Sequence, residues 1–336
     1  MAVRMKDIAD DLGVSLMTVS KALRNHSDIS EQTRNRVLKR MRELNYEPNW
    51  IARSMVTGRT YVVGLVLPDL MHSFFAEVAK GVALKLQPLG YQVVISDTEE
   101  DGEIERKQIG VLVNRKVDGL IVASAQHSGR LELFRMLDRN KIPYVLIDRI
   151  LPGTHANYVG VKDDDLGALA TEHLIAQGCR RVAHIRGPAV ATGTRRLRGY
   201  RRALTHHGMA YLPDYVASGQ YGDSTGYEAM QQLLNLNPRP DGVFCYNDPV
   251  AAGAIKAILE AQLRVPEDIA VIGAGNVHYS DLLRVPLSTI DQSSSTIGET
   301  AADMLARCME SKQPPAPRRI FIPPRLVIRD SSRRQG

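Results

Sequence analysis

Residues 14–25, VSLMTVSKALRN, combine small hydroxyl side chains, large apolar side chains and two cations in one short stretch. A helix over this stretch turns Val19, Ala22 and Leu23 inward, because these residues share one face at helical spacing. The surface left over at and near its N-terminus then carries Ser15, Leu16, Met17, Thr18, Ser20, Lys21 and Arg24.

These outward residues have the chemistry of DNA recognition. The major groove accepts one helix, whose N-terminal residues meet base edges. Lys21 can donate to guanine, Leu16 and Met17 can contact thymine methyl groups, and the hydroxyl groups suit phosphate oxygens. The alternative is a small protein-interaction module with an apolar patch.

A second set of polar residues follows apolar segments that have the character of buried strands. Asp148 follows PYVLI, Asn247 follows GVFCY, and Gly275 ends IAVIGAG. Arg196 lies in an arginine-rich segment after the loop GPAVATGT, and the arginine fork forms paired hydrogen bonds with hydroxyls, carboxylates or phosphates. The carboxyl ends of parallel strands meet at one edge of a sheet, so these residues predict a ligand site there.

Catalytic motifs are missing from the sequence. GAG at 273–275 is half of a dinucleotide fingerprint without its third glycine, and no GxSxG, Walker loop or HExxH occurs. The acidic run 163–165 is interpreted as helix capping and dipole chemistry. Cys179, Cys245 and Cys308 are far apart and are read as buried apolar residues. We therefore expect no enzyme activity, no cofactor and no metal site.

The first sixty residues contain the elements that would position the DNA-binding surface. Apolar residues recur at helical spacing up to Leu12, and Gly13 ends this first helix. Ser15 can cap the second helix, and Ser30 a third over 31–45. Two short helices joined by a tight turn and braced by a third predict a helix-turn-helix.

A further short helix is predicted over 50–57, after Pro48 and with Asn49 as its cap. Its apolar residues Ile51 and Met55 lie one turn apart. Eight residues are too few for a stable isolated helix in water, so a partner copy or DNA has to hold it.

From Tyr61 onward, apolar strand candidates alternate with helices. The strand candidates are 62–67, 91–96, 119–124 and 143–148, then 181–187, 215–220, 242–247 and 269–275; the clearest helices are expected near 75–86, 104–113, 165–177, 194–207, 224–236 and 248–262. Buried strands separated by helices indicate parallel sheets covered on both faces. The two series predict an α/β fold with two doubly wound, Rossmann-like subdomains and a ligand between them.

The charge is uneven along the chain. The 336 residues carry a net charge of +6, of which residues 1–60 contribute +4 (11 Lys and Arg against 7 Asp and Glu). This asymmetry favours a nucleic-acid partner for the first segment. No long apolar run and no apolar signal-peptide core occur, so we expect a cytoplasmic protein without a membrane span.

Taken together, these motifs resemble the LacI/GalR family of bacterial regulators. The resemblance covers nearly the whole chain and is carried by VSLMTVSKAL (14–23), ISEQTRNRVLKRMRELNYEPNWIARSM (29–55), VGLVLPDLMHSFFAEVAKGV (63–82), DGLIVAS (118–124), PYVLIDR (143–149), GPAVATGTRRLRGYRRAL (187–204), DGVFCYNDPVAAGAI (241–255), VPEDIAVIG (265–273), PLSTIDQ (286–292) and IGETAADML (297–305). It implies a homodimer that binds a near-palindromic operator, and a C-terminal domain like a periplasmic sugar-binding protein.

The resemblance also assigns residues. Segment 50–57 resembles the family's hinge helix, which adds Asn49, Arg53 and Met55 to the DNA-binding residues; Met55 stands where the family usually has Leu. The implied effector pocket consists of Ser73, Phe74, Asp148, Arg196, Tyr221, Asn247, Gly275 and Gln292. The C-terminus has no leucine heptad of the kind that makes the lac repressor a tetramer.

Gly275 departs from the family, which usually has an acidic residue there. Without that carboxylate, Arg196 is expected to be the dominant charge of the cleft, which favours a sugar acid or sugar phosphate over a neutral sugar. A bulkier neutral ligand that uses the space at Gly275 is the alternative.

The sequence thus predicts a headpiece at 1–47, a hinge and linker at 48–60, and an effector-binding and dimerisation domain at 61–336. The predicted function is a transcriptional regulator, most simply a repressor, that binds double-stranded operator DNA under the control of a carbohydrate-derived effector. A small-molecule-binding protein whose headpiece contacts other proteins is the alternative.

Overall fold

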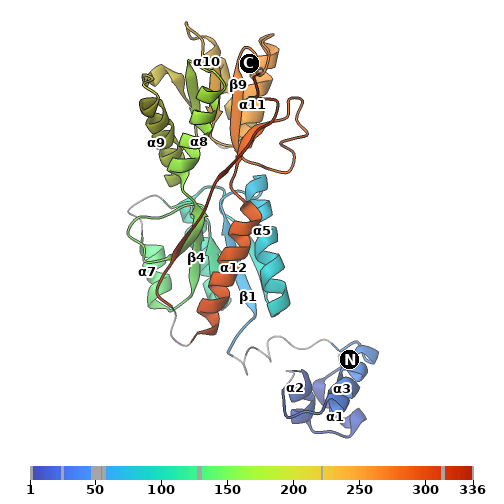
Figure 1. Ribbon diagram of the computed structural model, residues 1–336. Helices are drawn as coiled ribbons and strands as arrows, with labels where there is room; N and C mark the ends of the chain where they lie inside the picture. The colour runs from blue at the N-terminus through green and yellow to red at the C-terminus, as the bar shows by residue number, and fades with distance from the viewer. Residues whose placement is uncertain are drawn as a thin grey trace. The chain divides into compact units, whose positions relative to one another are not determined.

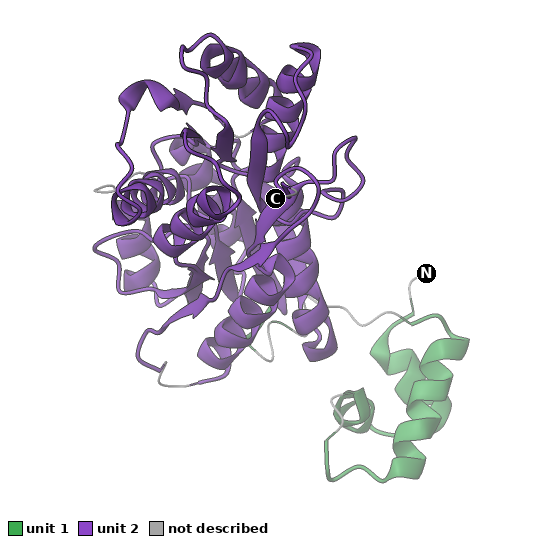
Figure 2. Cartoon of the chain, turned by 45° about the horizontal axis from the view of Figure 1, so that its top comes forward, with its two compact units in different colours: residues 1–60 green, residues 61–336 purple. Residues whose placement is uncertain are grey.

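The computed structural model describes residues 3–23, 26–46, 54, 58–126, 131–220, 222–311 and 315–334. The chain forms two compact units, residues 1–60 and 61–336 (Figure 2). Except for Ser54, the predicted helix at 50–57 lies outside the described residues.

Residues 3–23 and 26–46 of the first unit form the helices α1 (Met5–Leu12), α2 (Leu16–Leu23) and α3 (Glu31–Glu43). Their buried residues form one small core of Ile8, Ala9, Val19, Ala22, Val37 and Met41. Val19 and Ala22 are inward positions that the helical spacing of residues 14–25 predicted.

Local signals fix the ends of these helices. Gly13 ends α1 in the left-handed conformation, with φ +62°, which glycine adopts without steric cost. The Ser15 hydroxyl accepts a hydrogen bond of 3.0 Å from the Thr18 N–H at the start of α2. The Ser30 hydroxyl accepts one of 3.2 Å from the Thr33 N–H of α3. Both predicted serine caps are therefore present.

The second unit has two lobes, each built on a six-stranded sheet (Figure 1). Lobe A comprises β1 (Val62–Leu67), α5 (Ser73–Leu86), η1 (Gln87–Leu89), β2 (Gln92–Asp97), α6 (Gly102–Asn114), β3 (Gly119–Val122), α7 (Glu132–Arg139), β4 (Tyr144–Ile147), β5 (Asn157–Val161), α12 (Ser294–Glu310) and β11 (Arg319–Ile322). Its strand order is β11-β5-β4-β3-β1-β2, with all neighbours parallel.

Lobe B comprises α8 (Asp163–Ala176), β6 (Val182–Arg186), α9 (Ala191–His206), η2 (Pro213–Tyr215), β7 (Val216–Ser218), α10 (Asp223–Leu234), β8 (Gly242–Cys245), α11 (Asp248–Glu260), β9 (Ala270–Gly275), β10 (Ser288–Asp291) and β12 (Arg325–Val327). Its order is β12-β10-β9-β8-β6-β7, parallel except for the antiparallel edge strand β12. Alternate residues of each sheet pack against helices on opposite faces, as continuous apolar strands require.

The chain crosses between the lobes three times, after β5, after β10 and after β11. Helix α12 therefore follows a strand of lobe B but packs against α5 and the sheet of lobe A. In Figure 1 the C-terminal segment, in dark red, runs across both lobes. The two strand series read from the sequence include β1 to β4 and β6 to β9, whereas β5, α7 and everything from β10 onward fell outside them.

Candidate functional site

The N-terminus of α2 presents two large apolar side chains to solvent. Leu16 is 53% exposed and Met17 is 60% exposed. Neighbouring Ser15 and Thr18 join their hydroxyl groups in a 2.9 Å hydrogen bond beside them. Exposed leucine and methionine at a helix N-terminus gain nothing within this unit, so the surface has the form of a contact site.

The structure gives Lys21 a different surrounding from the one that the sequence predicted. Its ammonium group forms an ion pair with Asp28, 2.5 Å away, and Asp28 also contacts His26. Lys21 is therefore occupied within the unit and has to exchange this contact before it can bind a base. Arg24, Asn49, Arg53 and Met55 lie outside the described residues.

In the second unit, side chains from both lobes surround a cleft at the carboxyl ends of the strands. His72, Phe74, Phe75, Asp148, Arg149, Arg196, Tyr246, Asn247 and Gln292 line it. The cavity that they leave measures about 20 Å³, roughly the room of one water molecule. A larger ligand requires the lobes or these side chains to move apart.

Arg196 on α9 lies at the centre of a network of hydrogen bonds in the cleft. It is 3% exposed and donates to Asp163 Oδ1 (2.9 Å), the Tyr246 carbonyl (2.6 Å) and Gln292 Oε1 (3.0 Å). Its guanidinium also lies over the Tyr246 ring, 4.7 Å from the centroid. Burial raises the pKa of Asp163 to about 6, while Arg196 lowers it. At neutral pH Asp163 is therefore largely ionised and neutralises Arg196.

This pairing corrects the sequence prediction that Arg196 would be the dominant charge of the cleft. The reason is that Asp163, taken from the sequence as a helix-start residue, points its carboxylate at Arg196. The other cleft arginine, Arg149, is also neutralised: it makes a two-pronged contact with Glu100 at 2.5 and 2.6 Å.

Asp148 has a carboxylate that is less tightly held than those of Asp163 and Glu100, the acids that pair with the cleft arginines. Its backbone is held by the Val159 carbonyl and by the Tyr158 hydroxyl, in a left-handed conformation with φ +59°. The nearest ion-pair partner of its carboxylate is Arg149 Nε at 3.6 Å, and no hydrogen bond reaches the carboxylate from the described residues. Burial raises the pKa of Asp148, with Arg149 and Arg196 lowering it. A ligand hydroxyl can donate to this carboxylate.

His72 joins the lobes but cannot satisfy both of its neighbours. Its Nε2 lies 3.0 Å from the Asn247 amide nitrogen, and its Nδ1 lies 3.3 Å from the Phe74 N–H. Asn247 Oδ1 already accepts from the Val250 N–H at the start of α11, so its amide nitrogen can only donate to His72. Burial lowers the pKa of His72 to about 4. The neutral ring accepts only one hydrogen bond, so His72 can satisfy only one of these two donors at a time.

Five of the predicted effector-site residues meet in this cleft: Phe74, Asp148, Arg196, Asn247 and Gln292. Ser73 is not among the residues that line the cleft. Tyr221 lies outside the described residues. The sequence missed four residues that line the cleft, although each directly adjoins one that it singled out: His72, Phe75, Arg149 and Tyr246.

Gly275 also lies outside the lining, and the space next to it holds another carboxylate. A Cβ at Gly275 would lie 3.3 Å from Asp248 Oδ2. Asp248 is fully buried and accepts hydrogen bonds from Thr289, Ser280 and the Val277 N–H. The sequence interpretation assumed that the missing acid at Gly275 would leave positive charge dominant in this region. The Asp248 carboxyl beside Gly275 contradicts that assumption.

A buried acid braces the floor of lobe A near Arg149. Glu105 of α6 accepts from the Ser124 hydroxyl at 2.8 Å and from the Ala125 N–H at 2.5 Å. Burial raises the pKa of Glu105 to about 7. The segment that follows β3 is held by this carboxyl, and Arg149 donates to the Ser124 carbonyl from the other side.

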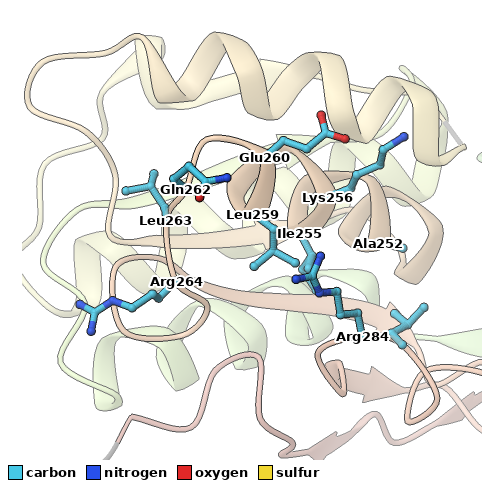
Figure 3. A pocket seen from close by; sticks show the side chains of 10 residues that line it. Ala252, Ile255, Lys256, Leu259, Glu260, Gln262, Leu263, Arg264 and Arg284 are labelled. Atoms are coloured by element: carbon cyan, nitrogen blue, oxygen red, sulfur yellow. The ribbon is translucent and has the colours of Figure 1, made fainter.

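A separate hollow of about 690 Å³ opens on lobe B and shares no lining residue with the cleft. Figure 3 shows that α11 supplies much of its wall, including Ile255, Lys256 and Leu259. Arg264 and Arg284 add further positive charge to the lining. Its open, mixed surface lacks the convergent polar groups found in the cleft.

Comparisons with known proteins agree with a DNA-binding unit joined to a ligand-binding unit. Residues 4–49 match the bacterial regulatory proteins of the lacI family, and residues 171–332 match a periplasmic binding protein-like domain. The chain is 32% identical to the HTH-type transcriptional repressor PurR of Aliivibrio salmonicida, covering 97% of this chain and 98% of that protein. It is 34% identical to the ribose operon repressor of Escherichia coli, covering 90% and 91%.

Solved structures extend the similarity to the fold. The lac repressor dimer bound to operator and the anti-inducer ONPF superimposes with a TM-score of 0.86, at 26% identity and 99% coverage of both chains. A complex of the transcriptional regulator CelR with cellobiose gives 0.75, at 30% identity, covering 98% of this chain and 99% of that one. The fold and site define a DNA-binding transcriptional repressor with an effector-binding domain. The chain belongs to the LacI family.

The described residues also bear on membrane insertion and metal binding. None of the helices there combines the length and apolarity needed to cross a bilayer. No group of three or more His, Cys, Asp or Glu side chains in the same part of the chain could hold a metal ion. Cys179, Cys245 and Cys308 are free and buried, as expected from their spacing.

Proposed function

We propose that the N-terminus of α2 reads operator bases through Leu16 and Met17. The observation that carries this assignment is their exposure, 53% and 60%, at the end of a helix in the helix-turn-helix unit. Apolar side chains there suit thymine methyl groups, and the Ser15 and Thr18 hydroxyls suit the adjoining phosphates. Lys21 exchanges Asp28 for a guanine when DNA binds.

The test begins with selection of operator sequences from a random DNA pool by the full-length protein. Fluorescence anisotropy then compares the selected operator with a scrambled duplex. Met17→Ala should reduce operator affinity about tenfold, with little change on scrambled DNA. Leu212→Ala, an exposed leucine of lobe B, is the control. Equal losses on both DNAs would show that Met17 does not read sequence.

We propose further that the cleft binds a neutral, hydroxyl-rich carbohydrate whose occupancy sets operator affinity. Both cleft arginines are paired with acids, at Asp163 and Glu100, while Asp148 keeps unbonded acceptor capacity. An anion would have to displace one of these acids, whereas a hydroxyl group can donate directly to Asp148. The sugar-bound relative CelR and the ribose operon repressors support a carbohydrate.

Calorimetric titration with ribose, cellobiose, glucose and gluconate tests this assignment. A neutral sugar should bind more tightly than gluconate, and Asp148→Asn should weaken it about 10- to 100-fold, the value of a charge-assisted hydrogen bond. The variant Asp214→Asn, an exposed acid of lobe B, should bind normally. Tightest binding of gluconate would contradict the proposal.

We also propose that two copies of the chain pair along the edge of lobe A. The edge strand β2 exposes Val94 and Ile95, 38% and 45% respectively. The adjoining loop exposes Leu70 and Met71, and the Leu70 N–H donates to Asp97 at the end of β2. An apolar, unpaired edge strand normally needs a cover.

Sedimentation of the full-length protein decides this point. Wild type should sediment as a dimer, and Val94→Lys with Ile95→Lys should shift it to monomer because the added charges cannot be buried. Leu212→Lys should leave the dimer intact. A dimer that survives the β2 changes would place the interface elsewhere.

A further inference from the structure

A second candidate binding site lies where the chain crosses between the lobes. A groove of about 340 Å³ is lined by Lys162, Asp164, Asp165, Arg195, Arg198, Arg202 and Phe321. Lys162 joins β5 to α8, and Phe321 lies on β11, so both belong to segments that connect the lobes. The groove shares no lining residue with the effector cleft.

The charges of this groove do not cancel. Arg198 makes a two-pronged contact with Asp164, and Arg202 contacts Asp165 at 2.9 Å. Arg195 has no ion pair or hydrogen bond within the described residues. Lys162 contacts no acid there, although its ammonium lies 5.7 Å from the centroid of the Phe321 ring. Two cations without an acidic contact partner therefore remain, and Arg195 lowers the pKa of Asp163 without forming an ion pair with it.

We propose that this groove binds a phosphate-bearing small molecule. A phosphate carries about two negative charges at neutral pH, which matches the two cations that lack an acidic partner. Arginine supplies planar donors and lysine a mobile point charge, the usual combination for phosphate. The Phe321 ring offers an apolar surface for the organic part of the ligand. The groove's size suits a small molecule better than an extended acidic chain.

The position of the groove gives such a ligand a route to the effector cleft. The three successive acids at the start of α8 pair with three arginines of α9: Asp163 with Arg196 in the cleft, Asp164 with Arg198 and Asp165 with Arg202 in the groove. A phosphate that competes for Arg198 acts on the same helix pair that holds Arg196. If the two sites are coupled, phosphate and effector change each other's affinity by the same factor.

The test uses the full-length protein, with inorganic phosphate and glucose 6-phosphate as probes and glucose as the uncharged comparison. Binding is followed by calorimetry and by phosphorus NMR line broadening at constant ionic strength. The double variant Lys162→Gln with Arg195→Gln should weaken both phosphate probes about tenfold or more. Arg201→Gln is the matched control, because Arg201 lies on the same helix but is held by the Tyr211 hydroxyl and ring.

Asp148→Asn separates this site from the effector cleft: it should leave binding of inorganic phosphate unchanged. Circular dichroism checks that the double variant is folded. If it is not, phosphate binding is measured on the single variants Lys162→Gln and Arg195→Gln. The proposal is wrong if wild type binds neither phosphate probe, if phosphate binding survives both substitutions, or if Asp148→Asn removes it. Binding of polyglutamate in place of the phosphates would instead make the groove a protein contact.

Discussion

Replacing Arg196 with Met should destabilise the second unit strongly, because it leaves Asp163 buried without its cation. The guanidinium makes three hydrogen bonds, and both side chains of the pair are at most 4% exposed. Breaking such a buried pair from one side costs about 3–5 kcal/mol. In a unit of this size that corresponds to a fall of about 10 °C in the melting temperature.

The second substitution Asp163→Asn should recover most of this loss, since it removes the uncompensated charge. The loss should also depend on pH. The pKa of Asp163, already raised to about 6 by burial, rises further without Arg196. Its folded-state pKa then lies still further above the unfolded value, so the penalty is full at high pH and disappears as the carboxyl takes up a proton.

Scanning calorimetry of the full-length variants at pH 8 and pH 5.5 measures both effects. Arg198→Met is the control on the same helix: its side chain is 69% exposed and its pair with Asp164 lies at the surface. That substitution should cost less than about 1 kcal/mol. The reasoning fails if Arg196→Met unfolds no earlier than Arg198→Met, or if its effect is the same at both pH values and is not relieved by Asp163→Asn.

Three further outcomes are expected. The stability advantage of Glu105→Gln over wild type should grow from pH 5 to pH 8, by up to about 3 kcal/mol, because the raised pKa of about 7 makes the wild-type carboxyl costly once it is ionised. Parallel thermal melts check this, and a pH-independent difference would contradict it. Gly199→Ala should destabilise lobe B, because its Cβ would lie 2.2 Å from the Asp164 carbonyl oxygen. Gly110→Ala, whose Cβ would meet nothing within 4 Å, should stabilise α6 by about 0.5–1 kcal/mol. Urea unfolding compares the two variants. Ser15→Ala should cost α2 about 1 kcal/mol, seen as faster amide exchange in that helix with α3 unchanged.

The elements that the sequence predicted are those with a strong local signal. Strand β1 was read at its observed bounds, Val62–Leu67, because a continuous apolar run is typical of a buried parallel strand. Helix α12 shows why other elements were missed. It follows a strand of lobe B yet packs on lobe A, and its tertiary contacts with α5 and with strands β3, β4 and β5 determine that placement. The Cβ that Gly298 lacks would meet the Val78 carbonyl at 2.2 Å, a close approach that the sequence alone does not show.

The site was predicted in part for a similar reason. Positions at strand ends found Asp148 and Asn247, because strand direction fixes where such residues gather. Their electrostatics depended on partners distant in sequence. Asp163 lies 33 residues from Arg196, and Gln292 lies 96 residues from it. The charge of the cleft could be judged only once these partners were known, and their pairing is the reason why we propose a neutral sugar in place of an anion.

The start of α8 links the two proposed ligand sites to the connection between the lobes. Lys162 and Asp163 are adjacent, yet Lys162 lines the groove and Asp163 pairs with Arg196 in the cleft. The helices behind them are in direct backbone contact, since a Cβ at Gly167 would lie 2.2 Å from the Arg196 carbonyl oxygen. Packed helices at this distance cannot move independently. We therefore expect a ligand that shifts Arg196 to act on the adjoining crossing segment at Lys162 as well.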